Sequence, residues 1–212
     1  FTHCKKHIIP FGADLEVFKP LDKSICKREH GIPADHLVLF VRALQSPYKN
    51  LSILKRVLQE LEFNIPVTLL TINGVGVFSE LSHKYNIVEY EFIYDDKTLV
   101  SLFNAADIFL MPSRRETFGM MAMEALACGV PALVSQGTPL PEVACVPDAG
   151  MAFPQDDVAA WKEGIARLAA DPEMRMRMGV AGRSLALKKY DINGYFSALT
   201  DLYEELITAR AG

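Results

Sequence analysis

The side chains best spaced for chemistry in this sequence are two glutamates, Glu116 and Glu124, which stand eight positions apart. If the stretch between them were helical, a rise of about 1.5 Å per residue would separate them by about 12 Å, so each carboxylate could bind a hydroxyl group at one end of an elongated ligand. Between them lie the N–H groups of Phe118, Gly119 and Met120, at the start of a predicted helix, where unpaired amides and the helix dipole favour an anion. Hydroxyl, anion and hydroxyl in that order match the hexose, diphosphate and ribose of a nucleotide diphosphate sugar.

Glu124 lies in a predicted helix, about 119–128, that is otherwise almost wholly apolar. Such a helix is normally buried on most of its surface, and burying an unpaired carboxylate is costly. Glu124 must therefore be paired, hydrogen-bonded or turned toward a cleft. Thr117 is the predicted N-cap of this helix, and Gly129 is its C-terminal stop. The structural alternative is that Glu116 caps the helix and Glu124 pairs with a nearby arginine.

A basic pair, Arg42 and Lys49, follows the first predicted buried strand, 37–41. Ligands of open parallel sheets bind just beyond the carboxyl ends of the strands, which is where these two cations stand. Arginine can grip phosphate oxygens with two N–H groups, and lysine supplies a compact charge. The pattern predicts an anion site, and the alternative is two solvated basic residues in a loop.

The elements that must position these residues alternate between strands and helices. The predicted strands are 37–41, 67–72, 88–93, 108–111, 132–134 and 149–153. The predicted helices are 22–30, 50–62, 95–104, 119–128, 157–170, one that begins at Pro172 and a last one over 195–206. This alternation predicts an α/β fold, with a doubly wound, Rossmann-like parallel sheet and helices on both faces. Gly74 and Gly76 follow a strand and are a weak sign of phosphate or base contact, because such glycines more often let the next helix pack closely.

The residues around the two glutamates resemble the E-x7-E signature of retaining GT-B glycosyltransferases, family 4 in particular. The run is Pro112-Ser113-x-x-Glu116-x-Phe118-Gly119-x4-Glu124, followed by Gly129-x-Pro131. Two earlier segments, 7–14 and 42–50, resemble the I-P-N-G-[VI]-D and G-R-x4-K-[GN] runs of the same family. The resemblance covers nearly the whole chain, and it is to the C-terminal, donor-binding domain of that fold.

The resemblance implies a role for each matching residue. Glu116 would contact the donor sugar, and Arg42 and Lys49 would neutralise the diphosphate as it leaves, which makes these three the expected catalytic residues. Glu124 would bind the ribose hydroxyls. The remaining donor-binding positions are Thr117, Phe118, Gly119, Met120, Gly74 and Ile93, the last of which ends the strand that contacts the base in this family.

The implied reaction is transfer of a hexose from a nucleotide diphosphate sugar to a hydroxyl acceptor, with retention of configuration. Because the basic pair would do the work of a metal ion, no essential metal or other cofactor is expected. Phe11 stands where the family usually has asparagine and Val41 where it has glycine, and the loop from Arg42 to Lys49 is two residues longer. A GT-B epimerase or phosphorylase would share the phosphate site and is an alternative, and the departures at Phe11 and Val41 leave open a non-catalytic sugar-nucleotide-binding module. A dinucleotide dehydrogenase is disfavoured because no G-x-G-x-x-G opens the first strand–helix turn.

Composition limits the partners. The chain has 212 residues, half of them apolar, which suits one domain over 1–212. With 22 basic and 26 acidic residues the net charge is −4, so no basic face for nucleic acid is expected. The four cysteines lack metal spacing, which predicts free thiols in the cytoplasm. His3 and His7 lack a third ligand, so no metal site is predicted there.

The chain begins at Phe1 and opens directly into strand-like residues, so we expect a fragment of a two-domain GT-B enzyme. The missing N-terminal half would hold the acceptor, which could be a glycan, a lipid or a small molecule, and the full-length enzyme could associate peripherally with a membrane. The last helix, about 192–209, would pack on that half through its apolar stripe. On this view the isolated fragment binds the donor but is inactive.

Overall fold

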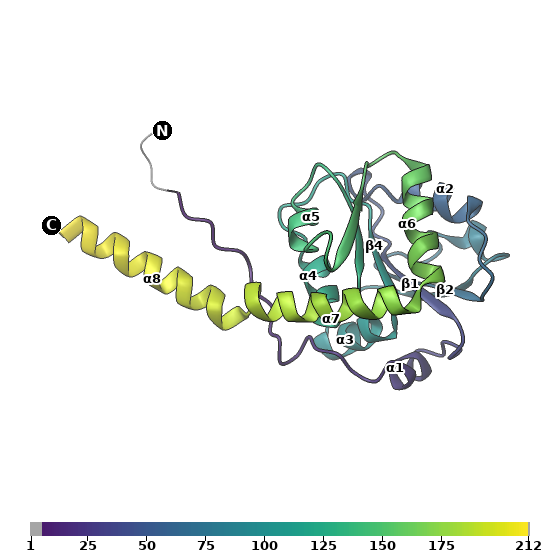
Figure 1. The fold of residues 1–212 in the computed structure, drawn as a ribbon, viewed down its shortest axis with the longest axis horizontal. Coiled ribbons are helices and arrows are strands. Elements are labelled where there is room, and N and C mark those ends of the chain that lie inside the picture. The colour runs from purple at the N-terminus through teal and green to yellow at the C-terminus, as the bar shows by residue number, and fades with distance from the viewer. Residues whose placement is uncertain (1–5, 212) are drawn as a thin grey trace.

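Six parallel strands form the sheet at the centre of the computed structural model, which describes residues 6–211 (Figure 1). They are β1 Leu37–Arg42, β2 Val67–Ile72, β3 Asn86–Tyr90, β4 Ile108–Met111, β5 Ala132–Ser135 and β6 Gly150–Phe153. Their order is β3-β2-β1-β4-β5-β6, and all neighbouring pairs are parallel. The doubly wound sheet is confirmed. Its order reverses between β1 and β4, and sheets of this kind bind ligands in the crevice at such a switch point.

Except for the short helix α5, which was not predicted, the helices lie where the sequence predicts, with shifts of a few residues at their ends. They are α1 Lys23–Glu29, α2 Leu51–Glu60, α3 Asp96–Ala105, α4 Met120–Ala127, α5 Leu140–Val143, α6 Val158–Ala170, α7 Pro172–Lys189 and α8 Ile192–Ala211, with short 3-10 turns η1 Pro47–Lys49 and η2 Ser79–Leu81. An aspartate side chain accepts a backbone N–H at the start of four of them: Asp22, Asp95, Asp157 and Asp171. Such caps fix where a helix begins.

Alternate residues of each strand face opposite layers of helices. Val38 and Phe40 of β1 join the core cluster beneath α3, α4 and α5, whereas Leu39 and Val41 join the cluster beneath α2 and α6. Both clusters are fully buried at these positions. The predicted arrangement of helices on both faces is therefore confirmed.

The third strand lies earlier than predicted. The apolar pattern indicates 88–93, but β3 is Asn86–Tyr90, and the chain beyond it forms a loop in which Phe92 and Tyr94 are exposed. The Glu91 carbonyl continues the pairing with the neighbouring chain by one bond, accepting the N–H of Asn73 at 3.0 Å. Aromatic residues that face solvent made the strand look longer than it is.

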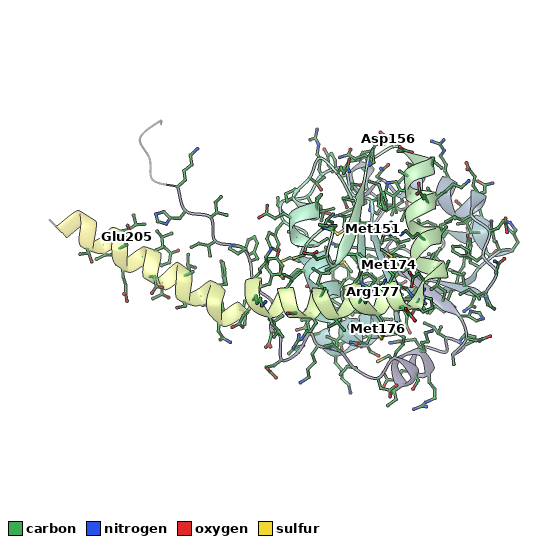
Figure 2. All side chains as sticks on the ribbon, viewed as in Figure 1. Met151, Asp156, Met174, Met176, Arg177 and Glu205 are labelled. Atoms are coloured by element: carbon green, nitrogen blue, oxygen red, sulfur yellow. The ribbon has the colours of Figure 1, made fainter. Side chains whose placement is uncertain are left out.

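The segment before α1 meets the junction of α7 and α8 at one point of the domain. The N–H of Ala13 donates to the carbonyl of Tyr190 at 2.8 Å, and the N–H of Ile192 donates to the carbonyl of Ala13 at 3.0 Å. From there α8 extends away from the sheet, and Figure 2 shows Glu205 far out along it. Its apolar residues Phe196, Tyr203, Leu206 and Ile207 are exposed.

Several expectations from composition fall partly outside the described residues. His3 and Cys4 lie there, so the structure says nothing of them. Cys26, Cys128 and Cys145 are free thiols, and all three are buried. Within residues 6–211, none of the helices combines the length and the apolar character needed to cross a bilayer.

Candidate functional site

The predicted catalytic residues meet at the switch point of the sheet. Arg42 is the last residue of β1, Lys49 ends η1, and Glu116 lies in the loop that leaves the neighbouring strand β4. The Lys49 ammonium donates a short hydrogen bond to a Glu116 carboxylate oxygen, with only 16% and 13% of the two side chains exposed. Arg42 and Lys49 also line one small cavity with Ser113. The structure thus brings the three residues together, with one cation already paired to the carboxylate.

Arg42 is oriented from the next strand. Its Nε donates to Oδ1 of Asn73 at 3.1 Å, and Asn73 directly follows β2. Because this bond uses only Nε, it leaves the two terminal nitrogens of the guanidinium for a ligand, and their fork suits phosphate oxygens. Asn73 therefore orients a cation at the mouth of the site.

The loop that carries Glu116 is fastened on both sides. The Arg114 N–H donates to the Tyr48 carbonyl at 2.7 Å, and the Arg114 guanidinium forms a short two-pronged ion pair with Asp156. Figure 2 shows Asp156 at the upper edge of the view, beyond the end of β6. The Arg115 guanidinium lies 5.2 Å from the centre of the Tyr48 ring. The loop is thus held between the loops that follow β1 and β6.

The start of α4 has no side-chain cap, and the Thr117 prediction is wrong. The N-cap is Gly119, in the left-handed region with φ 111°, and Thr117 is exposed. A β-carbon at Gly119 would lie 2.4 Å from Cδ2 of Leu140, so both space and backbone require glycine. Among the described residues at the start of α4, the first backbone amide with a hydrogen bond is that of Ala122, which donates to the Gly119 carbonyl at 2.9 Å. The amides of Phe118, Gly119 and Met120 are left without intramolecular acceptors there, as an anion site requires.

Glu124 is half-buried, and one of its carboxylate oxygens, Oε2, is buried without a hydrogen-bond partner among the described residues. The pKa of Glu124 is raised to about 7, mainly by burial and then by the nearby charge of Asp96, while the charge of Arg42 opposes them. Within residues 6–211 no arginine forms a salt bridge with Glu124, and Arg42 lowers its pKa only through its charge at a distance.

Gly74 and Ile93 lie on loops that flank this centre. A β-carbon at Gly74 would lie 2.2 Å from the Ala43 carbonyl oxygen, so the loops after β1 and β2 touch through their backbones. A 3-10 turn, η2, follows Gly74 rather than the helix that the glycine pattern favours. Ile93 lies beyond the end of β3, half-buried against the core under α3 and α4. The described residues contain no cluster of three His, Cys, Asp or Glu side chains that could hold a metal ion.

Comparison with known proteins identifies the family. The model of the family "Glycosyl transferases group 1" matches residues 22–185. The chain belongs to this family. It is 30% identical to the D-inositol 3-phosphate glycosyltransferase of Saccharomonospora viridis, over 95% of the chain and 50% of that protein. This group 1 glycosyltransferase chain thus spans about half the length of the curated relatives it matches.

Solved structures share the fold of this glycosyltransferase chain. Sucrose-phosphate synthase from Thermosynechococcus elongatus has a TM-score of 0.85 at 23% identity, covering 98% of this chain and 54% of that one. Anabaena HepE in complex with UDP and glucose has a TM-score of 0.78 at 17% identity, covering 91% and 55%. The C-terminal domain of LpcC from Francisella tularensis has a TM-score of 0.73 at 18% identity, covering 85% and 100%. At these identities the likeness establishes the GT-B fold alone.

Two residues at this candidate site were missed by reasoning from sequence. Asn73 orients Arg42, and Asp96, in the first turn of α3, acts on Glu124. The position of Asn73 directly after a confident strand was a usable signal, because neighbouring parallel strands end at the same edge. Asp96 gave no such signal, since its proximity to Glu124 depends on how α3 packs against α4.

Proposed function

We propose that this chain is the donor-binding domain of a retaining, family 4-type glycosyltransferase that transfers a hexose from a nucleotide diphosphate sugar to a hydroxyl acceptor. The observation that carries the proposal is the meeting of Arg42, Lys49, Glu116 and the uncapped start of α4 at the switch point. Cations and free amides suit a diphosphate, and an adjacent carboxylate suits sugar hydroxyls. The UDP and glucose bound by HepE, which has the same fold, agree with this choice of ligand.

In this proposal, the two cations and the start of α4 would bind the diphosphate. Arg42 and Lys49 would bind its oxygens, with the amides of Phe118, Gly119 and Met120 completing the site and Thr117 bordering it. Negative charge builds on the diphosphate as the sugar leaves, and fixed positive groups stabilise that charge without reorganising. Family membership makes the chain part of a transferase, and the cation pair leads us to propose that no metal is essential.

The two glutamates would divide the rest of the donor. Oε2 of Glu124, which has no hydrogen-bond partner among the described residues, would accept a ribose hydroxyl, whereas Glu116 would accept hydroxyls of the hexose. Gly74 and Ile93, on the loops after β2 and β3, would border the base. Orienting the sugar over the reacting centre is where Glu116 would contribute to rate.

The acceptor would be bound by a part of the enzyme that this sequence does not contain. The chain covers half of its relatives but the whole of the LpcC C-terminal domain, which supports a single domain over 1–212 taken from a two-domain enzyme. A glycan, lipid or small-molecule acceptor fits this proposal, as does peripheral membrane association of the full-length enzyme. Buried free thiols agree with a cytoplasmic protein. We expect the isolated domain to bind the donor without turnover.

Thermal unfolding with UDP and UDP-glucose tests the proposal. At 100 times its dissociation constant, a ligand should add about 2.7 kcal/mol to the free energy of unfolding. Protection is expected in EDTA as well as in magnesium, and Arg42→Ala should weaken it. Lys162→Ala, which removes a cation from the remote surface pair with Glu60, is the matched control. No protection by either nucleotide would refute donor binding, and protection only with magnesium would refute the metal-free part.

A further inference from the structure

Phe118 lies inside the loop that carries Glu116 and the free amides, and two rings from distant parts of the chain contact it. Phe11 meets it nearly edge to face, with ring centres 5.4 Å apart and planes at 77°. Tyr190, at the end of α7, meets it with centres 6.0 Å apart and planes at 88°. Tyr190 is buried, and its hydroxyl donates to the Glu142 carbonyl at 3.3 Å. Phe118 therefore has one neighbour in the core and one at the surface.

Phe11 is fixed in place although half of it is exposed. Its neighbour Gly12 packs so closely on the chain after α7 that a β-carbon there would lie 2.6 Å from Cα of Ile192. The next residue, Ala13, makes the two backbone hydrogen bonds to Tyr190 and Ile192. A second ring, Tyr195 of α8, lies 5.8 Å from that of Phe11. The segment that carries Phe11 is thus anchored beside the loop between β4 and α4, which carries Glu116 and Phe118 and is called the donor loop.

Within the described residues, hydrogen bonds support the front half of the donor loop but not the amides from Phe118 to Met120. Its front half is tied down through Arg114 and through the pair of Glu116 with Lys49. From Phe118 to Met120, by contrast, the amides are unbonded within the described chain, and α4 begins without a side-chain cap. Together with the packing of Gly119 on Leu140, the contacts of the Phe118 ring fix the direction of these amides.

We propose that Phe11 is a positioning residue for donor binding. Acting through Phe118, it holds the amides of Phe118, Gly119 and Met120 in the orientation that receives the diphosphate. This inference rests on the proposed function, and it concerns a residue that departs from the family pattern. Phe11 thereby links the start of the described chain to a donor site built almost entirely from residues 42–124.

Two variants and a control test this role. Phe11→Asn removes the ring, and Phe11→Tyr keeps it. Phe196→Asn is the control, because Phe196 is similarly exposed and pairs with Tyr195, yet its ring contacts within residues 6–211 do not include Phe118. An aromatic pair contributes enough that Phe11→Asn should lower UDP and UDP-glucose affinity about two- to tenfold by calorimetry. Phe11→Tyr and Phe196→Asn should bind as the parent does.

Hydrogen exchange supplies a readout that needs no ligand. The amides of Ala122 and Met123 bond to the Gly119 carbonyl, so they report the order of the first turn of α4. Their exchange should accelerate in Phe11→Asn alone, with thermal unfolding confirming that each variant is folded. Unchanged exchange, equal acceleration in Phe196→Asn, or faster exchange with unaltered UDP affinity would each overturn the role. If the parent binds neither nucleotide, the proposed function fails, and exchange alone decides whether Phe11 holds the loop.

Discussion

Replacing Glu116 with glutamine should strengthen binding of UDP, because the lysine that would grip the diphosphate is already held by this carboxylate. The Lys49–Glu116 pair is only 16% and 13% exposed, so water and salt weaken it little. The hydrogen bond between the Lys49 ammonium and the Glu116 carboxylate should contribute about 1.5–3 kcal/mol. The uncharged amide oxygen of glutamine is a weaker acceptor and should contribute about 0.5–1.5 kcal/mol, so the change releases about 1–1.5 kcal/mol. That corresponds to about a five- to tenfold gain in UDP affinity.

UDP-glucose should behave differently. The same variant frees Lys49 but loses the carboxylate that would bind the hexose, so the two effects oppose each other. The ratio of UDP-glucose to UDP affinity should therefore fall by about tenfold or more, which is about 1.4 kcal/mol. Isothermal titration calorimetry of both ligands against parent and variant measures this ratio directly.

Two further variants decide whether the gain comes from Lys49. In a Lys49→Met background, Glu116→Gln should have no effect on UDP, because no cation remains to be released. Glu60→Gln, which neutralises the exposed pair with Lys162, should leave both ligands unaffected. A loss of UDP affinity in Glu116→Gln, or the same gain without Lys49, would refute the reasoning.

Three other changes probe neighbouring features. Because the pKa of Glu124 is raised to about 7 from 4.5, the parent should lose stability as the pH rises through this range. In urea unfolding, Glu124→Gln should be more stable than the parent by up to about 3 kcal/mol at pH 8 but little changed below pH 5. Asp107 accepts the Val38 N–H and pairs with Lys23 and the buried Lys27, so Asp107→Asn should cost about 3–5 kcal/mol in the same assay while the UDP affinity of the folded fraction is kept. Gly74→Ala, with its methyl group 2.2 Å from the Ala43 carbonyl, should lower the melting temperature by the equivalent of about 1–3 kcal/mol.

The strands and most helices could be predicted because their signals are local. The run 37–41 is apolar throughout, as a strand buried on both faces must be, and β1 matches it within a residue. The predicted helices 22–30, 95–104 and 157–170 begin at aspartates, and the structure has these aspartates as the N-caps of α1, α3 and α6. The end of β3 was wrong because exposed aromatic residues continue its pattern, and Thr117 was wrong because Leu140 and the left-handed Gly119 set the start of α4 instead.

The site could be predicted only as a set of residues on the right loops. Arg42, Lys49 and Glu116 each follow a predicted strand, and parallel strands end at one edge, so their proximity was inferable. Their pairing was not, because the bond between Lys49 and Glu116 joins side chains 67 positions apart. The contact of Phe11 with Phe118 depends in the same way on the packing of the Phe11 segment against the junction of α7 and α8, which no local pattern encodes.

The bridge between Ala13 and Asp191 has a consequence for the order of folding. It joins residues about 180 positions apart, and the entropy lost in closing so long a loop delays such a contact until the chain between is compact. The sheet can therefore assemble first, with α4 already packed, while Phe11 is still unattached. Refolding followed at Phe118 should show its ring becoming ordered after Trp161, which is fully buried in the core. The donor loop would be the last part of the domain to reach its native rigidity.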